Sequence, residues 1–180
     1  IKTLADLSGK VESVSFSPDG KYLASASDDK TIKIYSISDS NFNLLKTIND
    51  HTKPITSVSF SPDGKYLTSA SEDKTVKIYS ISGSNFNLIK TLADHSSFVS
   101  SVSFSPDGKF LVSASGDKTV KIYSISGSNI HLRKTINTTN SDISSVSFSL
   151  DGKFLASASY DTVKIYSISG YNFELIKTLN

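Results

Sequence analysis

A unit of 44 residues recurs four times along this chain, and this repetition restricts the possible folds more than any other feature. The pentapeptide Ser-Val-Ser-Phe-Ser occurs at 13–17, 57–61, 101–105 and 145–149, always 44 residues after the previous copy. Units of this kind bury their apolar surface against neighbouring units rather than on their own. The four copies therefore predict a row of similar units in contact with one another.

Each repeat contains four short segments rich in Val, Ile, Phe, Tyr, Thr and Ser. In the second repeat they lie at about 55–60, 66–71, 75–81 and 85–92. Pro-Asp-Gly at 62–64 separates the first two, because proline fixes φ in a turn and glycine takes the position that needs a free backbone. No segment shows a useful helical period. Four short antiparallel strands per repeat predict one blade of a β-propeller, so the expected fold class is all-β.

The repeat resembles the WD40 family over essentially the whole chain. The matching stretch reads Ser-Val-x-Phe-Ser-Pro-Asp-Gly-Lys-x-Leu-x-Ser-x-Ser-x-Asp-x-Thr-x-Lys-Ile at 57–78. The family's Trp-Asp at the end of the third strand is replaced by Tyr-Ser, as at 79–80. The resemblance implies a β-propeller of WD40-like four-stranded antiparallel blades, four of them in this chain.

The repeat boundaries predict a single propeller segment, 1–180, with blades at about 5–48, 49–92, 93–136 and 137–180. Residues 1–4 match the end of the last repeat, so we expect them to belong to the outer strand of a preceding blade. The chain has no methionine, which favours a piece of something longer. Four blades leave two open sheet edges, and such edges favour association. We therefore expect self-association into an eight-bladed ring or membership of a longer repeat array, in preference to a closed four-bladed ring, which would need unusually splayed blades.

The resemblance also implies a hydrogen-bonded set of side chains in each blade. The set joins a histidine before the first strand, a serine of the second strand, the turn aspartate and the residue at the Trp position, here a tyrosine. The first and fourth repeats lack the histidine and carry Leu7 and Thr139 instead. The residues so assigned are His51, Ser69, Asp73 and Tyr79 in the second repeat, His95, Ser113, Asp117 and Tyr123 in the third, Ser25, Asp29 and Tyr35 in the first, and Ser157, Asp161 and Tyr166 in the fourth.

Composition and charge argue against several function classes. Lys and Arg number 19 against 17 Asp and Glu, and Arg133 is the sole arginine, so no basic stripe suited to nucleic acid is present. No apolar run approaches the ~18 residues that span a membrane. The absence of cysteine rules out disulfides and thiolate metal sites. With no signal-like start, a cytoplasmic location is expected.

Serine, histidine and aspartate recur together, which raises the question of a hydrolase triad. The Ser and Asp positions repeat in all four copies, as a scaffold does, whereas an active site needs one asymmetric constellation. We therefore expect no catalytic residue and no enzyme activity. His51 and His95 belong to separate repeats and do not converge as metal ligands must, so neither a metal nor a cofactor is expected.

Positions that differ between the copies are the candidates for partner binding, because the specific function of a propeller lies in its loops. In WD40 relatives these positions surround the mouth of the central channel, where partner peptides dock, and the resemblance implies the same here. Phe98 and Tyr160 are the aromatic members of the set and suit an anchoring role. The candidates are Lys10, Glu12, Asp28, Pro54, Thr56, Glu72, Phe98, Ser100, Asp142, Ser144 and Tyr160.

The leading functional hypothesis is a non-catalytic scaffold or ligand-sensing module that binds other proteins or peptides on the loop face around the channel. The alternative is a self-assembling structural repeat protein, either a dimer of half-propellers or a filament, that associates through its open edges. An enzyme is the third and least favoured class.

Overall fold

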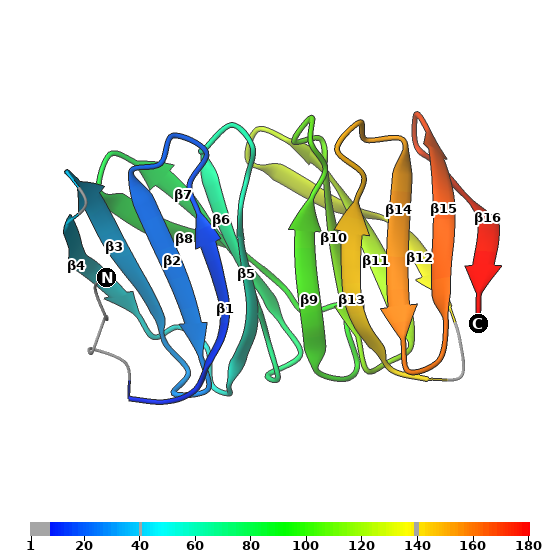
Figure 1. Cartoon of the computed structure of the whole chain (residues 1–180), viewed down its shortest axis with the longest axis horizontal. Helices are drawn as coiled ribbons and strands as arrows, with labels where there is room; N and C mark the ends of the chain where they lie inside the picture. Colours follow the sequence, from blue (N-terminus) through cyan, green and yellow to red (C-terminus); the bar gives the residue numbers. More distant parts are fainter. Residues whose placement is uncertain (1–7, 40, 139–140) are drawn as a thin grey trace.

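The chain folds into four separate antiparallel sheets of four strands each (Figure 1). The computed structural model describes residues 8–39, 41–138 and 141–180, which contain sixteen strands and no helix. We call the sheets blades 1 to 4 in chain order. The predicted all-β fold with four four-stranded blades is confirmed, whereas the assignment of residues 1–4 lies outside the described residues.

The strands are β1 (Val11–Phe16), β2 (Tyr22–Ser27), β3 (Ile32–Ser38) and β4 (Asn41–Ile48) in blade 1; β5 (Ile55–Phe60), β6 (Tyr66–Ser71), β7 (Val76–Ser82) and β8 (Asn85–Leu92) in blade 2; β9 (Val99–Phe104), β10 (Phe110–Ser115), β11 (Thr119–Ser126) and β12 (Asn129–Asn137) in blade 3; β13 (Ile143–Phe148), β14 (Phe154–Ser159), β15 (Val163–Ser169) and β16 (Asn172–Leu179) in blade 4.

A compact turn joins the first two strands of every blade. In blade 1, Ser17 Oγ donates to Asp19 Oδ1 at 2.7 Å, and Asp19 Oδ1 also accepts the backbone N–H of Lys21 at 3.1 Å. Gly20 takes a φ of +71°, which glycine adopts at little cost. Blade 4 has Leu150 in place of proline and still forms the turn, with Ser149 Oγ 2.6 Å from Asp151 Oδ1. The serine and aspartate therefore hold the turn whether or not proline is present.

The turn between the second and third strands is one residue shorter in blade 4 than in the other blades, because Asp161 is followed directly by Thr162. In blade 2 the N–H of Ser71 donates to the carbonyl of Thr75, and Lys74 between them has a φ of +73°. Blade 4 lacks this lysine, and the N–H of Ser159 donates to Thr162 one residue sooner. The strand pairing beyond the turn keeps the same register, because Ser157 pairs with Lys164 as Ser69 pairs with Lys77.

The core lies between blades rather than within them. Three buried apolar clusters fill the interfaces of blades 1–2, 2–3 and 3–4. Each cluster combines residues from the second, third and fourth strands of one blade with residues of the next blade. Between blades 1 and 2, for example, Ala24, Ile32 and Ile34 pack with Val58 and Phe60. Since a lone sheet cannot cover both of its faces, this packing explains why the unit must recur.

The first strands of the four blades, β1, β5, β9 and β13, lie side by side (Figure 1). Serines of one blade accept backbone N–H groups of the next: Ser13 Oγ accepts from Val58 at 3.2 Å, and Ser57 Oγ accepts from Val102 at 3.4 Å. The repeated serines of Ser-Val-Ser-Phe-Ser thus satisfy backbone donors across the interface, where water has little access.

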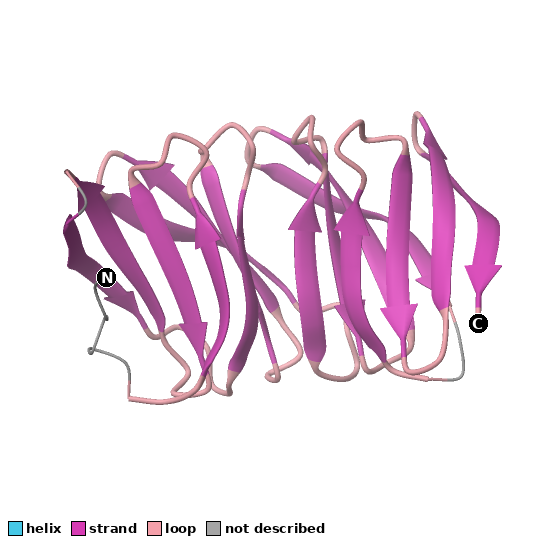
Figure 2. Cartoon of the chain, in the orientation of Figure 1, coloured by secondary structure: helices cyan, strands magenta, loops and turns pink. Residues whose placement is uncertain are grey.

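Loops gather at two opposite edges of the molecule (Figure 2). One edge carries the Pro-Asp-Gly turns and the loops between third and fourth strands, and we call it the Pro-Asp-Gly edge. The opposite edge carries the turns between second and third strands and the connections between blades. It includes His51 and His95, and we call it the histidine edge.

Candidate functional site

At the histidine edge of blade 2, three side chains form a buried hydrogen-bonded line. His51 Nδ1 lies 2.8 Å from Asp73 Oδ2, and His51 Nε2 lies 2.8 Å from Ser69 Oγ. Because an ionised carboxylate only accepts, Nδ1 carries the proton and Nε2 accepts from the serine hydroxyl. The histidine therefore ties the connection between blades to both the second strand and the turn.

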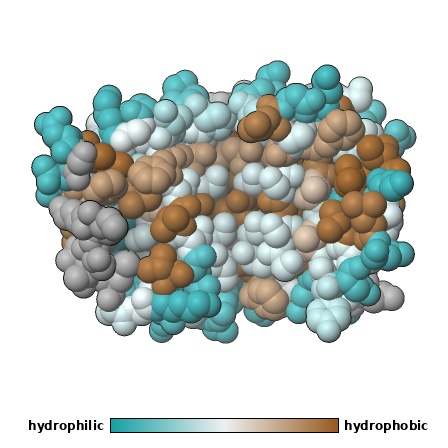
Figure 3. Space-filling model, in the orientation of Figure 1, coloured by the Kyte–Doolittle hydropathy of each residue, from teal (hydrophilic) through white to brown (hydrophobic). Residues whose placement is uncertain are grey.

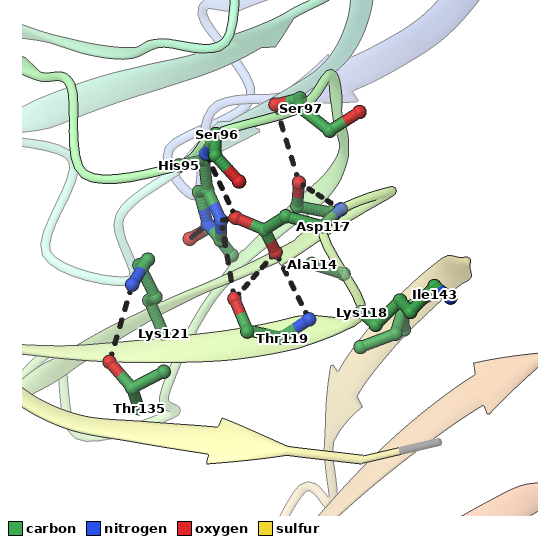
Figure 4. A network of polar contacts seen from close by, with 12 residues as sticks. His95, Ser96, Ser97, Ala114, Asp117, Lys118, Thr119, Lys121, Thr135 and Ile143 are labelled. Atoms are coloured by element: carbon green, nitrogen blue, oxygen red, sulfur yellow. Dashed lines mark hydrogen bonds and ion pairs between the residues drawn. The ribbon is translucent and has the colours of Figure 1, made fainter. Parts of the chain in front are cut away.

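Blade 3 repeats this geometry (Figure 4). His95 Nδ1 lies 2.8 Å from Asp117 Oδ2, and Nε2 lies 2.7 Å from Ser113 Oγ. The other oxygen, Asp117 Oδ1, accepts from the Thr119 hydroxyl at 2.6 Å and from its N–H at 3.0 Å. The N–H of Ser96 donates to Asp117 Oδ2 at 3.0 Å. Both carboxylate oxygens are thus fully used within the blade.

The surroundings set the protonation of these groups. Burial lowers the pKa of His95, and the Asp117 carboxylate opposes this only in part, so the imidazole is neutral at pH 7. Burial alone raises the pKa of Asp117, but hydrogen bonds from Thr119, His95 and Ser96 outweigh it and lower that pKa to about 2. The pKa of His51 and that of Asp73 are lowered for the same reasons.

The tyrosines at the Trp position are buried beside this line. The Tyr79 and Tyr123 hydroxyls make no hydrogen bond to the residues that the structure describes. Burial, aided by Asp50 and Asp94 respectively, raises the pKa of each phenol. The described contacts therefore join three of the four assigned side chains in blades 2 and 3.

Blades 1 and 4 lack the histidine and differ from this pattern. In blade 1, Ser8 Oγ donates to Asp29 Oδ2 at 2.7 Å, at the oxygen that the histidine contacts in blades 2 and 3. Ser25 Oγ, which would face the histidine, is buried and has no hydrogen bond to a described residue. Tyr35 and Tyr166 are buried as their counterparts are, Ser157 is buried, and Asp161 is exposed. The histidine position of blade 4, Thr139, lies outside the described residues.

The order Ser–His–Asp is also the order of a hydrolase triad, yet its position does not suit catalysis. Ser69 and Ser113 are both completely buried. A nucleophilic serine must reach the carbonyl carbon of a substrate, so these hydroxyls have no access to one. Their hydrogen bonds hold the blade together.

Two contacts here were missed by sequence reasoning. Thr75 Oγ1 donates to Asp73 Oδ1 at 2.6 Å, and Thr31 does the same to Asp29. The repeated Asp-Lys-Thr triplet carries this signal, because a hydroxyl two residues after a turn aspartate is well placed to bond it. Ser8 follows Leu7 in sequence, and nothing in the repeat pattern indicates its role.

The proposed partner-binding positions all lie at the histidine edge, and backbone hydrogen bonds join the two loops that carry several of them. In blades 1 to 3, the N–H of the residue before the turn aspartate donates to the carbonyl of the residue before the first strand, at 3.0 Å. These pairs are Lys10 with Asp28, Pro54 with Glu72, and Phe98 with Gly116.

Several candidate positions already have partners within the chain. Thr56 Oγ1 donates across the interface to Val99 O at 2.6 Å, and Ser100 Oγ donates similarly to Ile143 O. Lys10 Nζ pairs with Glu12 at 2.9 Å, and Ser144 Oγ donates to Ala158 O at 3.2 Å. Asp142 and Tyr160 belong to blade 4, and Tyr160 is 95% exposed.

Phe98 and Gly116 form the most specific pair on this edge. The Phe98 ring lies over the glycine, and its exposed fraction is 37%. The Phe98 carbonyl accepts from Ser115 Oγ at 2.7 Å and from the N–H of Gly116 at 3.0 Å. An apolar ring is thereby held at the surface on a fixed backbone.

A groove lies on the opposite, Pro-Asp-Gly edge, between blades 3 and 4. Its volume is about 620 Å³, and its walls include Phe110, Phe148 and Tyr171. Arg133 lies 5.5 Å from the centre of the Tyr171 ring. None of the proposed partner-binding residues lines this groove, so the two edges offer separate candidate surfaces.

The described residues hold neither a metal-ligand cluster nor a membrane-spanning helix. No group of three or more His, Asp or Glu side chains gathers there as metal ligands would. Within residues 8–39, 41–138 and 141–180, no helix has the length and apolarity to cross a membrane.

A row of four-stranded antiparallel blades, with a buried Ser–His–Asp line at one edge, defines a β-propeller architecture of the WD-repeat class. The WD40 family model, described as "WD domain, G-beta repeat", matches residues 1–36, 42–80, 86–124 and 131–167. The chain belongs to the WD40 family. Members of this family typically serve as scaffolds that bind other proteins or peptides, and they are generally not catalytic.

A curated relative, the WD repeat-containing protein SL1-17 of Schistosoma mansoni, is 69% identical to the chain over 29 residues. This alignment covers 16% of the chain and 10% of that protein. The similarity therefore concerns less than one repeat unit.

Proposed function

We propose that this chain is a non-catalytic scaffold or ligand-sensing module that docks a protein or peptide on its histidine edge. The observation that carries the proposal is the Phe98 ring, which lies at the surface over Gly116 on a backbone fixed by two hydrogen bonds. A rigid, partly exposed aromatic side chain loses little conformational entropy on binding and is typical of the residues that dominate interface energy.

The neighbouring blade supports the same surface. Tyr160 of blade 4 is 95% exposed and stands at the position equivalent to Gly116. Adjacent blades thus carry two aromatic side chains on one edge. We propose that the partner is a peptide segment with an apolar side chain that contacts Phe98.

Panning a random peptide library on the immobilised chain tests this proposal. The selected peptides are then measured against Phe98→Ser, Tyr160→Ser and Tyr171→Ser, the last being an exposed aromatic on the opposite edge. Loss of a central aromatic anchor costs at least about tenfold in affinity. We expect that loss with Phe98→Ser and no change with Tyr171→Ser.

The unfolding midpoint of each variant serves as a control for folding, since all three side chains are at least partly exposed. Peptides that keep their affinity for Phe98→Ser and Tyr160→Ser would overturn the proposed surface. If those peptides also lose affinity for Tyr171→Ser, docking takes place at the groove between blades 3 and 4.

A further inference from the structure

Within the part of the chain that the structure describes, blades 1 and 4 each have one face that no other blade covers, and the two faces come from opposite sides of the repeat. Blade 1 exposes Val14 and Phe16, each at 59%, whereas their counterparts Val58, Phe60, Val102 and Phe104 are at most 8% exposed against the preceding blade. On blade 4 the open face is the opposite side of the sheet, the side that faces the following blade in blades 1 to 3. There Leu179 is 45% exposed, whereas its counterparts Ile48, Leu92 and Ile136 in the other blades are at most 9% exposed.

These two faces are complementary because the chain already contains their interface three times. The surface that covers Val58 and Phe60 is the β2–β4 side of blade 1, including Ala24, Ile34 and Ile48. Blade 4 presents the same side through Ala156, Ile165 and Leu179, which are only half-buried or exposed. The face of blade 4 therefore fits the face of blade 1.

The arrangement of the blades places both faces on one side of the molecule. In Figure 1, blades 1 and 4 lie at the two sides, β5 and β9 stand between them, and the outer strands of blades 2 and 3 lie behind. In the same orientation, Figure 3 shows hydrophobic residues gathered over blades 1 and 4. A single flat partner with the same two faces can thus cover both at once.

We propose that a second copy of this chain covers this side, so that blade 1 of each copy packs on blade 4 of the other and two chains close an eight-bladed ring. A twofold rotation pairs the two unlike faces twice, which gives a closed dimer rather than an open-ended filament. This inference concerns assembly and does not depend on where a peptide docks.

The contacts across the new interface follow from the existing ones. Ser101 Oγ accepts the N–H of Val146, and Ser145, one repeat later, accepts the N–H of Val14 in the second copy. Lys134 Nζ donates to Phe173 O at 2.8 Å, and Lys46 Nζ donates to Phe86 O at 2.7 Å. Lys177 stands at the equivalent position of blade 4 and faces blade 1 of the second copy.

Sedimentation equilibrium of the chain over a wide range of concentration tests the proposal. We expect a limiting mass of twice 19.4 kDa. Val14→Lys places a charge on the open face of blade 1 and should yield monomers. Leu44→Lys is the matched control: Leu44, Leu88, Leu132 and Leu175 are similarly exposed in all four blades, so this position belongs to no blade interface. That variant should remain a dimer.

A cysteine cross-linking experiment distinguishes the orientation, and the absence of native cysteine makes it clean. Mixing a Val14→Cys chain with a Ser145→Cys chain and adding a short bismaleimide should give a cross-linked dimer. Val14→Cys alone should give none. A monomeric mass at the highest concentration, a mass that grows without limit, or cross-linking of Val14→Cys alone would each overturn the closed ring.

Discussion

The ring of Phe98 occupies the space above Gly116: a β-carbon added to that glycine would lie 2.3 Å from Phe98 Cε1. The equivalent pairs in blades 1 and 2 are Lys10 with Asp28 and Pro54 with Glu72. Phe98 is the one aromatic residue among the four positions before a first strand, and Gly116 is the one glycine among the four positions before a turn aspartate. The aromatic ring thus occurs in the blade whose facing residue has no side chain to displace it. Both residues depart from the repeat, and they do so together.

This relationship predicts the effect of Gly116→Asp, which introduces the residue that blade 1 has at this place. The new β-carbon displaces the Phe98 ring, whose far end is free to swing into solvent. We expect the free energy of unfolding to change by less than about 1 kcal/mol. The affinity for selected peptides should fall as it does in Phe98→Ser, as measured by fluorescence polarisation.

The double variant Gly116→Asp/Phe98→Ser provides the control. If the glycine acts only through the ring, the two effects on affinity are not additive, and the double variant binds as weakly as Phe98→Ser alone. Full additivity would mean that Gly116 contacts the peptide by itself.

The Ser–His–Asp line predicts different costs for the same substitution in two blades. Ser113→Ala removes the hydroxyl that donates to His95 Nε2, and a buried nitrogen is left without its partner. We expect a loss of about 1–3 kcal/mol in the free energy of unfolding, measured by urea denaturation. Ser25→Ala is the matched control, because Ser25 Oγ is buried without a described partner. Its removal should be neutral or stabilising, and equal losses in the two variants would contradict this account.

Much of this fold is readable from the repeat itself. The strands expected at about 55–60, 66–71, 75–81 and 85–92 are found as β5 to β8 with shifts of at most one residue. Alternating β-branched and aromatic residues fix the strands, and Pro-Asp-Gly fixes a turn, so local signals suffice. A single four-stranded sheet cannot bury both of its faces, so a repeated unit is expected to pack against the next copy. The interfaces between blades were predictable for this reason.

Other features depend on contacts that one repeat does not contain. Ser8 substitutes for a missing histidine by reaching Asp29, and only the folded loop brings them together. The pairing of Phe98 with Gly116 crosses 18 positions in sequence and becomes visible only when the backbone bond between them is known. The partner-binding set as a whole stays a prediction.

Tyrosine at the Trp position gives a further prediction. Because the Tyr79 hydroxyl is buried and makes no hydrogen bond to a described residue, Tyr79→Phe removes a desolvation penalty and no bond. The free energy of unfolding should stay the same or rise by up to about 1 kcal/mol. Tyr22→Phe is the comparison, since its hydroxyl donates to Gly83 O of the next blade at 3.1 Å. A loss of stability in Tyr79→Phe would show that the phenol completes the network.

The two buried histidines and their aspartates predict that acid destabilises the chain in two stages. Burial lowers the pKa of His51 and His95 below the usual 6.5, so between the folded pKa and 6.5 the unfolded chain binds more protons. Stability is therefore full above pH 6.5 and falls as the pH drops below it.

The second stage comes from the aspartates. Asp117 has a pKa of about 2 in the folded chain against 3.8 for an unperturbed group, so its contribution is present above pH 3.8 and is lost as the pH approaches 2. This difference corresponds to about 2 kcal/mol. Urea denaturation at a series of pH values should show both stages in the unchanged chain. The variant His51→Asn/His95→Asn should lose the first stage, whereas His131→Asn, on the exposed surface of β12, should keep it. An identical pH profile for all three proteins would mean that the buried histidines titrate equally in the folded and unfolded states.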